Sequence, residues 1–199
     1  MELKKYFASP IHWEDASQFL YLDAASNSYI DEAKKENEEQ YVYHSKNNLF
    51  FDPQFNNFVD YVNLKSIEFL EAQGFDVSDH KTYCSEMWVQ EFNSKGGGSH
   101  STHTHWNSHV SGFYFLKGGP GTSYPMFHDP RPGALMTKLP LKDNSKINEA
   151  TDAFHLKVGA GALVLFNSYL PHEFVTHSGK NPFRFIHFNL QFLPNGIFK

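Results

Sequence analysis

Four histidines stand close together in the middle of the chain. His100, His103, His105 and His109 all fall within residues 96–116, GGGSHSTHTHWNSHVSGFYFL, between two stretches of strand-like composition. On an extended strand, side chains two residues apart point to the same face, so His103 and His105 can direct their imidazoles to one ion. Neutral imidazole is a common protein ligand for zinc, iron, copper and nickel. The spacing therefore predicts a metal site.

A third candidate ligand begins a later strand-like run. The apolar segment 163–166 is followed by His172, which opens the alternating run HEFVTH. In a sandwich or barrel of antiparallel strands, the end of one strand and the start of another can meet at the same mouth. His172 can there join His103 and His105, and these three histidines form the preferred ligand set.

The order of these features resembles that of the Fe(II)/2-oxoglutarate oxygenases. The segments SGFYFL (111–116), FHDPR (127–131) and RFIHFN (184–189) look like the family called Putative 2OG-Fe(II) oxygenase, which is written around HxH, SGxYY, DPR and a terminal RxxxxFN. The resemblance covers roughly residues 86–193. It implies a non-haem Fe(II) enzyme that uses 2-oxoglutarate and O2, releases succinate and CO2, and hydroxylates an unidentified substrate.

The ligand set departs from the wider oxygenase superfamily at one position. The superfamily has Asp or Glu as the second member of the pair, which gives two histidines and one carboxylate on iron, whereas this chain has His105. Three solutions remain open: the three-histidine set, Asp129 as the carboxylate ligand, or His109 in place of one member. Asp129 could equally cap the turn that Pro130 and Pro132 impose. The remaining histidines are interpreted as surface or hydrogen-bonded side chains: His12, His44, His80, His128, His155, His177 and His187.

The predicted role of Arg184 follows from charge. If 2-oxoglutarate chelates the metal through its keto-acid end, its far carboxylate lies between the sheets, and a guanidinium offers it a two-pronged hydrogen bond. Arg184 shares a strand face with the core-like Ile186, and a buried arginine requires an anion. The resemblance would also place Tyr114 near that carboxylate. Asn189 matches a further family position and is assigned to the same co-substrate site.

Composition limits the class of protein. The chain has 199 residues, enough for one domain with a sizeable core. Its single cysteine, Cys84, excludes an intrachain disulfide and suits a reducing cytoplasm. A net charge of −5 without Lys/Arg clusters argues against nucleic-acid binding. Neither a membrane-length apolar run nor a signal-peptide core occurs, so a cytoplasmic protein is expected. The sequence does not indicate an oligomeric state.

The N-terminal third is expected to support the site with helices and one strand. An early strand at 5–13 should pair on the edge of the main sheet, and the charged segment 31–43 should form a surface helix. Asp52 followed by Pro53 predicts the start of a second helix, which should run to Gly74.

The rest of the chain has a strand-type pattern. Short β-type runs occur at 87–93, 110–116, 154–158, 162–166, 173–177 and 183–192. No helical stretches separate them, as parallel strands would require, so the strands should be antiparallel. We expect a mainly β fold with packed helices: a double-stranded β-helix (jelly roll, cupin-like) over 83–195, with 1–82 as support, in one domain, 1–199. The loop 129–152 is the expected lid.

Other functions fit parts of the pattern. A cupin-like dioxygenase would hold its metal with three histidines and bind its substrate directly, without 2-oxoglutarate. A zinc hydrolase is disfavoured because Asn107 and Ser108 stand where HxHxDH requires Asp and His, and HExxH does not occur. A non-catalytic jelly-roll binding module would carry no stoichiometric transition metal.

The type of ligand does not by itself identify the metal. An all-nitrogen set suits zinc or copper as well as iron, so iron rests on the resemblance. Binding requires neutral imidazoles, and we therefore expect the metal to be lost as the pH falls through ~6.5.

Overall fold

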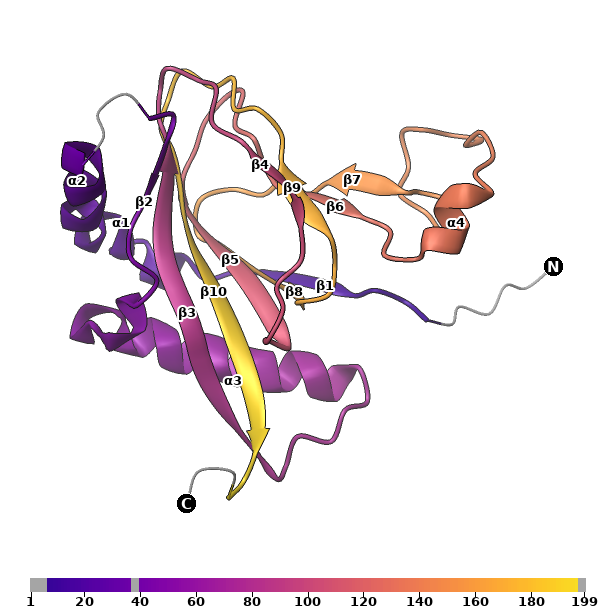
Figure 1. Ribbon diagram of the computed structural model, residues 1–199, viewed down its shortest axis with the longest axis horizontal. Helices are drawn as coiled ribbons and strands as arrows, with labels where there is room; N and C mark the ends of the chain where they lie inside the picture. Colours follow the sequence, from indigo (N-terminus) through magenta and orange to yellow (C-terminus); the bar gives the residue numbers. More distant parts are fainter. Residues whose placement is uncertain (1–6, 37–39, 197–199) are drawn as a thin grey trace.

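Two antiparallel β-sheets form the centre of the computed structural model, which describes residues 7–36 and 40–196 (Figure 1). The large sheet has the strand order β1-β8-β5-β10-β3-β2. Its strands are β1 Ile11–Asp15, β8 Ala162–Asn167, β5 Val110–Lys117, β10 Phe183–Pro194, β3 His80–Phe92 and β2 Val42–His44. The small sheet has the order β4-β9-β6-β7, with β4 His100–His103, β9 His172–Phe174, β6 Met126–His128 and β7 Ala153–His155. This arrangement confirms the predicted jelly roll.

Helices from the N-terminal part of the chain cover the outer face of the large sheet (Figure 1). They are η1 Ser17–Phe19, α1 Leu22–Ala25, α2 Asn27–Glu36, η2 Leu49–Phe51, η3 Pro53–Phe55 and α3 Asn56–Ala72. A further short helix, α4 Pro132–Met136, lies in the excursion between β6 and β7, away from the other helices. No helix among the described residues is both long and apolar enough to cross a membrane.

The segment predicted as one helix from Asp52 to Gly74 consists of the short 3-10 helix η3 followed by the long helix α3. The Asp52 side chain accepts a hydrogen bond from the backbone N–H of Gln54 at 2.9 Å, and Pro53 occupies the first position, where its missing N–H costs nothing. After α3, Gly74 adopts φ +93°, which a residue with a side chain rarely does. Phe58 and Val62 are fully buried on the face of α3 that contacts the sheet.

The large sheet is apolar on both faces, and β10 contributes to both. Ile186 and Phe188 point to the outer core, which lies between the sheet and the helices. Phe183 and Phe185 point to the inner core, which lies between the two sheets and is mainly aromatic. Because side chains alternate along a strand, the even-numbered residues named here enter the outer core and the odd-numbered ones enter the inner core.

Strand β5 comes very close to its neighbour at Gly112. A Cβ atom at this position would lie 2.2 Å from Cζ of Phe188 and 2.7 Å from the carbonyl oxygen of Val164. The absence of a side chain lets the Phe188 ring lie over β5 and contact Phe58 of α3, with ring centroids 5.9 Å apart. The glycine of the SGFYFL segment therefore has a packing role.

Three parts of the chain differ from the sequence-based expectation. The helix predicted for 31–43 is α2, which ends at Glu36, and residues 42–44 instead form β2, because their β-branched and aromatic side chains suit a strand with Tyr43 buried. The strand expected at 5–13 is β1, which pairs on the sheet edge as expected but spans Ile11–Asp15, so residues 7–10 are not part of it, and residues 1–6 lie outside the described part. Strand β4 is the extended segment expected at His103, but it ends there and does not include His105, and the short strand β6 was not predicted.

Candidate functional site

Three histidines converge where β4 and β9 pair. His103 ends β4, His172 begins β9, and the two are register partners. His105 follows two residues after β4, and its Nε2 lies 3.3 Å from Nε2 of His172. One nitrogen from each of the three imidazoles lies within 4.8 Å of the others, which brings the predicted set together. Such a group can hold a metal ion.

Two of these imidazoles are oriented by the backbone. Nδ1–H of His103 donates to the carbonyl of Ser101 at 2.7 Å, and Nδ1–H of His172 donates to the carbonyl of Leu170 at 3.0 Å. A proton fixed on Nδ1 leaves the lone pair on Nε2 for a metal. Both rings thus present Nε2 to the cluster.

Burial keeps His105 and His172 neutral. Desolvation, helped by the nearby His103, lowers the pKa of His105 to about 4. Desolvation also lowers the pKa of His172 to about 3, against the opposing effect of its hydrogen bond to Leu170. His172 is completely buried, whereas His103 and His105 keep part of their surface exposed. At neutral pH His105 and His172 are therefore neutral imidazoles, the protonation state that metal ligation needs.

Asn189 of β10 connects the cluster to the large sheet. Its Oδ1 accepts a hydrogen bond from Ser111 at 2.7 Å and one from Nε2 of His187 at 3.1 Å. Its Nδ2 donates to Glu86 at 2.8 Å and lies 3.3 Å from Nδ1 of His105. Asn189 was predicted to bind the co-substrate, and the structure places it directly behind one of the candidate ligands.

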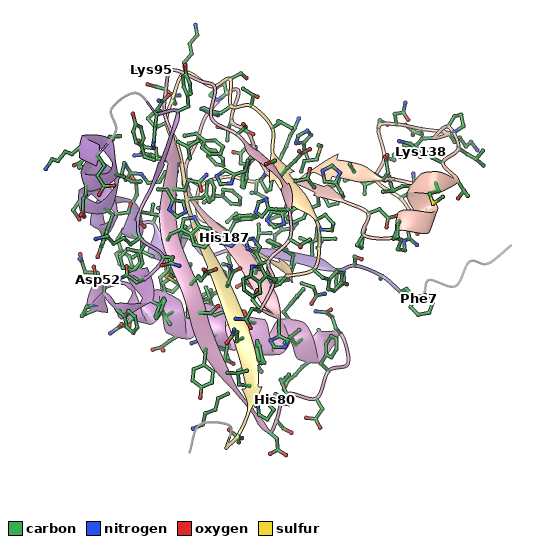
Figure 2. All side chains as sticks on the ribbon, viewed as in Figure 1. Phe7, Asp52, His80, Lys95, Lys138 and His187 are labelled. Carbon is green, nitrogen blue, oxygen red and sulfur yellow. The ribbon has the colours of Figure 1, made fainter. Side chains whose placement is uncertain are left out.

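His187 is a site residue that sequence reasoning missed. Its ring centroid lies 4.5 Å from that of His105 and 5.0 Å from that of Phe113, at the centre of the molecule in Figure 2. Burial, followed by the charges of neighbouring histidines, lowers its pKa well below the usual value. Phe185, His187 and Asn189 follow one another at every second position of β10, so their side chains point to the same face of the strand. This spacing was the feature of the sequence that could have identified His187 as a site residue.

The predicted position of Arg184 is wrong. Its side chain is buried, but on the outer face of the large sheet, where Nη2 donates to Glu91 at 2.7 Å. Burial alone would raise the pKa of Glu91, but Lys34 and Arg184 outweigh this effect and lower it. Arg184 does share a face with Ile186, as expected, but that face belongs to the outer core. The anion that a buried arginine requires is a carboxylate of the protein itself.

Tyr114 also lies on the outer face. Its hydroxyl donates to the carbonyl of Ala16 at 3.0 Å, and its ring contacts Phe19 and Phe58 under the helices. Burial raises the pKa of its hydroxyl far above the usual value. The structure therefore does not bring Tyr114 to the histidines, which corrects its assignment to the co-substrate site.

The alternative ligands lie outside the cluster. The carboxylate of Asp129 accepts three hydrogen bonds from Arg131, one from its backbone and two from its guanidinium, so it stabilises the turn. Nδ1 of His109 accepts from the backbone N–H of Phe192 at 3.1 Å. Among the described residues, the three-histidine set is the combination that the structure brings together.

A cavity of about 540 Å³ lies beside the small sheet. It is lined by residues of β6 and of the following loop, including His128 and Arg131, by Phe154 of β7 and by Ile11 of β1. The three histidines do not line it, but Phe127 does, and its ring lies 6.0 Å from the ring of His172. The role of the loop 129–152 as a lid remains a prediction.

Two antiparallel sheets with a histidine cluster between them define a jelly-roll metal-binding protein. The family described as Putative 2OG-Fe(II) oxygenase matches residues 86–189, more than half of the chain, and the chain belongs to this family. No curated protein matches it.

Solved structures of other proteins share the fold at low sequence identity. EvdO2 from Micromonospora carbonacea var. aurantiaca aligns with a TM-score of 0.62 and 13% identity, over 96% of this chain and 89% of that chain. A Pseudomonas putida prolyl-4-hydroxylase aligns with a TM-score of 0.56 and 12% identity, over 94% of each chain. The epimerase SnoN in complex with Fe3+, alpha-ketoglutarate and nogalamycin RO aligns with a TM-score of 0.57 and 10% identity, over 95% and 83%. At these identities the likeness establishes the fold.

Iron and 2-oxoglutarate are the cofactors of this family. The residues present fit the metal, because three imidazoles converge and two have Nε2 directed by their Nδ1 hydrogen bonds. Among the described residues, no buried cationic side chain lies beside the three histidines to bind the far carboxylate of 2-oxoglutarate. Among residues 7–36 and 40–196, Arg184 is the only buried lysine or arginine, and it faces the helices.

Proposed function

We propose that the chain is an Fe(II)- and 2-oxoglutarate-dependent dioxygenase that hydroxylates a C–H bond of an organic substrate. In the balanced reaction, substrate, 2-oxoglutarate and O2 give hydroxylated substrate, succinate and CO2, with one oxygen atom entering succinate and the other entering the product. The observation that carries the proposal is the convergence of His103, His105 and His172 inside the segment that matches the family.

The metal, when bound, would supply the redox chemistry, and the chain would hold and shield it. Backbone bonds orient His103 and His172, and Asn189 lies behind His105. Aromatic rings surround His172, with centroids 4.8 Å away for Phe166 and 5.6 Å away for Phe113. They exclude water from the buried side of the cluster, so ligands approach from the side on which His103 and His105 are partly exposed.

Anaerobic reconstitution tests this function. Protein loaded with Fe(II) should develop the weak visible charge-transfer band of an iron-bound keto acid when 2-oxoglutarate is added. His172→Ala should lose both iron and the band, because it removes a buried ligand, whereas the matched variant His155→Ala, at an exposed position, should keep both. Stoichiometric iron without a band in the unmodified protein would contradict the proposal.

A second candidate is a dioxygenase that holds iron with three histidines and oxidises its organic substrate without 2-oxoglutarate. The all-histidine composition of the cluster favours it, as does the outward position of Arg184. This enzyme would bind iron, give no band with 2-oxoglutarate, and consume O2 at a rate independent of added 2-oxoglutarate.

A further inference from the structure

2-Oxoglutarate carries a carboxylate at each end. One end, with the adjacent keto oxygen, can chelate a metal. The far carboxylate lies two methylene groups away and needs hydrogen-bond donors once it leaves water. The donors that lie near the candidate metal ligands therefore decide how this co-substrate is recognised.

Arg184 cannot serve that carboxylate, because each of its three guanidinium nitrogens already contacts acceptors on the opposite side of the large sheet. Nε and Nη2 donate to Glu91 at 2.9 and 2.7 Å. Nη1 donates to side chains of Asp23, Ser26 and Asn27 at distances from 2.8 to 3.1 Å. These acceptors come from β3 and from the segment of α1 and α2, on the side of the large sheet opposite the histidines.

Trp88 of β3 lies on the histidine side. Its ring centroid is 4.2 Å from that of His187, which is itself 4.5 Å from that of His105. The Nε1–H of Trp88 is buried and has no hydrogen-bond partner. Native proteins pair nearly all such donors, because an unpaired one loses its bonds to water without replacement. A ligand carboxylate beside the histidines would provide the missing acceptor.

Gln90 and His100 are further candidate hydrogen-bond donors beside Trp88. Gln90 is two residues from Trp88 on the same strand face and is 1% exposed. Its Nε2 lies 2.9 Å from Nε2 of His100, whose ring centroid is 6.0 Å from that of His103. A carboxamide has two N–H groups, and this contact engages one of them. The second can donate to a ligand.

The exposure of these residues places them on the open side of the site. Trp88, His100 and His103 are partly exposed, whereas Phe113 and Phe174 are buried in the inner core. A ligand attached to the histidines can therefore extend past Trp88 and His100 more easily than into the aromatic interior.

We propose that Trp88, Gln90 and His100 bind the far carboxylate of 2-oxoglutarate, and that Arg184 does not; this inference rests on the proposed function. Because Nε2 of Gln90 donates to Nε2 of His100, the N–H of the neutral His100 ring is on Nδ1. The indole Nε1–H, the second carboxamide N–H and this Nδ1–H each supply a hydrogen bond to the carboxylate, which charge strengthens. Recognition then depends on neutral donors in place of an ion pair. Arg184 keeps its bonds to Glu91 whether or not the co-substrate is bound.

The test compares two keto acids on the full chain loaded anaerobically with Fe(II). 2-Oxoglutarate and pyruvate share the chelating end, but pyruvate lacks the far carboxylate, so the ratio of their dissociation constants reports the recognition of that group. Titrations of the charge-transfer band give both constants. In Trp88→Phe and Gln90→Leu, 2-oxoglutarate should bind about tenfold more weakly while pyruvate binding stays unchanged. Arg184→Gln should keep the ratio of the unmodified protein and lower the melting temperature.

The outcomes separate the two levels of the proposal. A band with both keto acids, but a ratio insensitive to Trp88→Phe and Gln90→Leu, overturns the inference and leaves the proposed function intact. The inference is also overturned if Arg184→Gln loses the preference for 2-oxoglutarate over pyruvate that the unmodified protein shows. If that variant does not fold, Arg184→Lys and Glu91→Gln probe the same ion pair. Absence of a band with either keto acid in iron-loaded unmodified protein overturns the proposed function and the inference together.

Discussion

His103 and His172 are oriented in the same way, each by a hydrogen bond from Nδ1 to the carbonyl two residues before it. A bond of this kind selects the tautomer and holds the ring plane, so these two rings need little rearrangement to receive a metal. His105 instead has the amide of Asn189, from a distant part of the chain, 3.3 Å from its Nδ1. The orientation of the third imidazole therefore depends on the position of β10.

Removal of the Asn189 side chain should strengthen metal binding. The amide Nδ2–H of Asn189 can only donate to Nδ1 of His105, which places the proton of the neutral ring on Nε2. We expect Asn189→Ala, which frees Nδ1 to take that proton, to bind Fe(II) or Co(II) more tightly. Metal competition titrations on folded protein would measure the change. Asn195→Ala, at an exposed turn position, serves as the control and should bind metal normally. Weaker binding in Asn189→Ala would show that the amide matters for the position of His105 and not for its tautomer.

The spacing of the histidines predicted the preferred ligand set, although Asp129 and His109 remained open as alternatives. His103 and His105 are neighbours in the sequence, and His172 begins an alternating strand, so local periodicity carried that information. The residues around the histidine cluster depend on pairing between distant strands. His187 and Asn189 reach the cluster because β10 pairs with β5 in one particular register. Sequence periodicity does not reveal which face of that strand looks toward the small sheet.

The same ambiguity explains the misplacement of Arg184. Alternation correctly grouped Arg184 with Ile186 and correctly predicted that it is buried and paired with an anion. The large sheet, however, has an apolar core on each face, and residues of similar character fill both. Periodicity separates the two faces of a strand but does not identify which face carries the site.

The ion pair of Glu91 and Arg184 should stabilise the contact between helices and sheet. Both side chains are at least 96% buried, so Glu91→Gln leaves a buried guanidinium short of its counterion. We expect the free energy of unfolding to fall by about 3 kcal/mol. Urea denaturation would measure it. Glu68→Gln, which alters an exposed pair with Lys65, should change stability by less than about 0.5 kcal/mol; equal effects would contradict the role of the buried pair.

Gly112→Ala should disturb the packing of β5 against β10. The added methyl group would meet Cζ of Phe188 at 2.2 Å and the Val164 carbonyl at 2.7 Å, so the sheet or the ring must move. A loss of about 3 kcal/mol is expected in thermal or urea denaturation. Gly133→Ala, where no atom lies within 4 Å of the new Cβ, is the matched control and should be neutral. A neutral Gly112→Ala would mean that the Phe188 ring moves aside freely.

Long elements with a strong pattern were predictable, and short ones were predictable only in part. Helix α3 has an apolar stripe, and β5, β8 and β10 have long β-type runs. The short strands β7 and β9 lie at the start of predicted β-type runs. Strand β6 has only three residues, and its extended conformation depends on pairing with β7 and β9, farther along the sequence. Too few residues are involved there for periodicity to indicate a strand.

The metal-free protein as a whole should become less stable as the pH falls below ~6.5. Burial lowers the pKa of His100 and His105 to about 4 and that of His172 to about 3, whereas histidines in the unfolded chain bind protons near 6.5. The unfolded chain therefore takes up more protons between these values, and the free energy of unfolding falls as the pH falls. The midpoint of urea denaturation, measured at several pH values between 7 and 4.5, would show how steeply stability depends on pH.

Two comparisons test the origin of that slope. His187→Gln removes a buried histidine of strongly lowered pKa and should reduce the slope, whereas His155→Gln, at an exposed site, should not. Saturating metal should raise the midpoint at neutral pH, because only the folded chain presents three convergent imidazoles. A midpoint independent of pH in the metal-free protein would contradict the buried, neutral state of these rings.

Strand β10 lies in the middle of the large sheet, between β5 and β3, although it is the last strand along the described chain. During synthesis, β3 and β5 leave the ribosome long before their shared partner exists. Each then presents an unpaired edge and a row of aromatic side chains, which is the situation most prone to aggregation. The emergence of residues 183–194 ends that exposure, so the yield of folded protein in a cell should depend on how well chaperones protect the nascent chain until then.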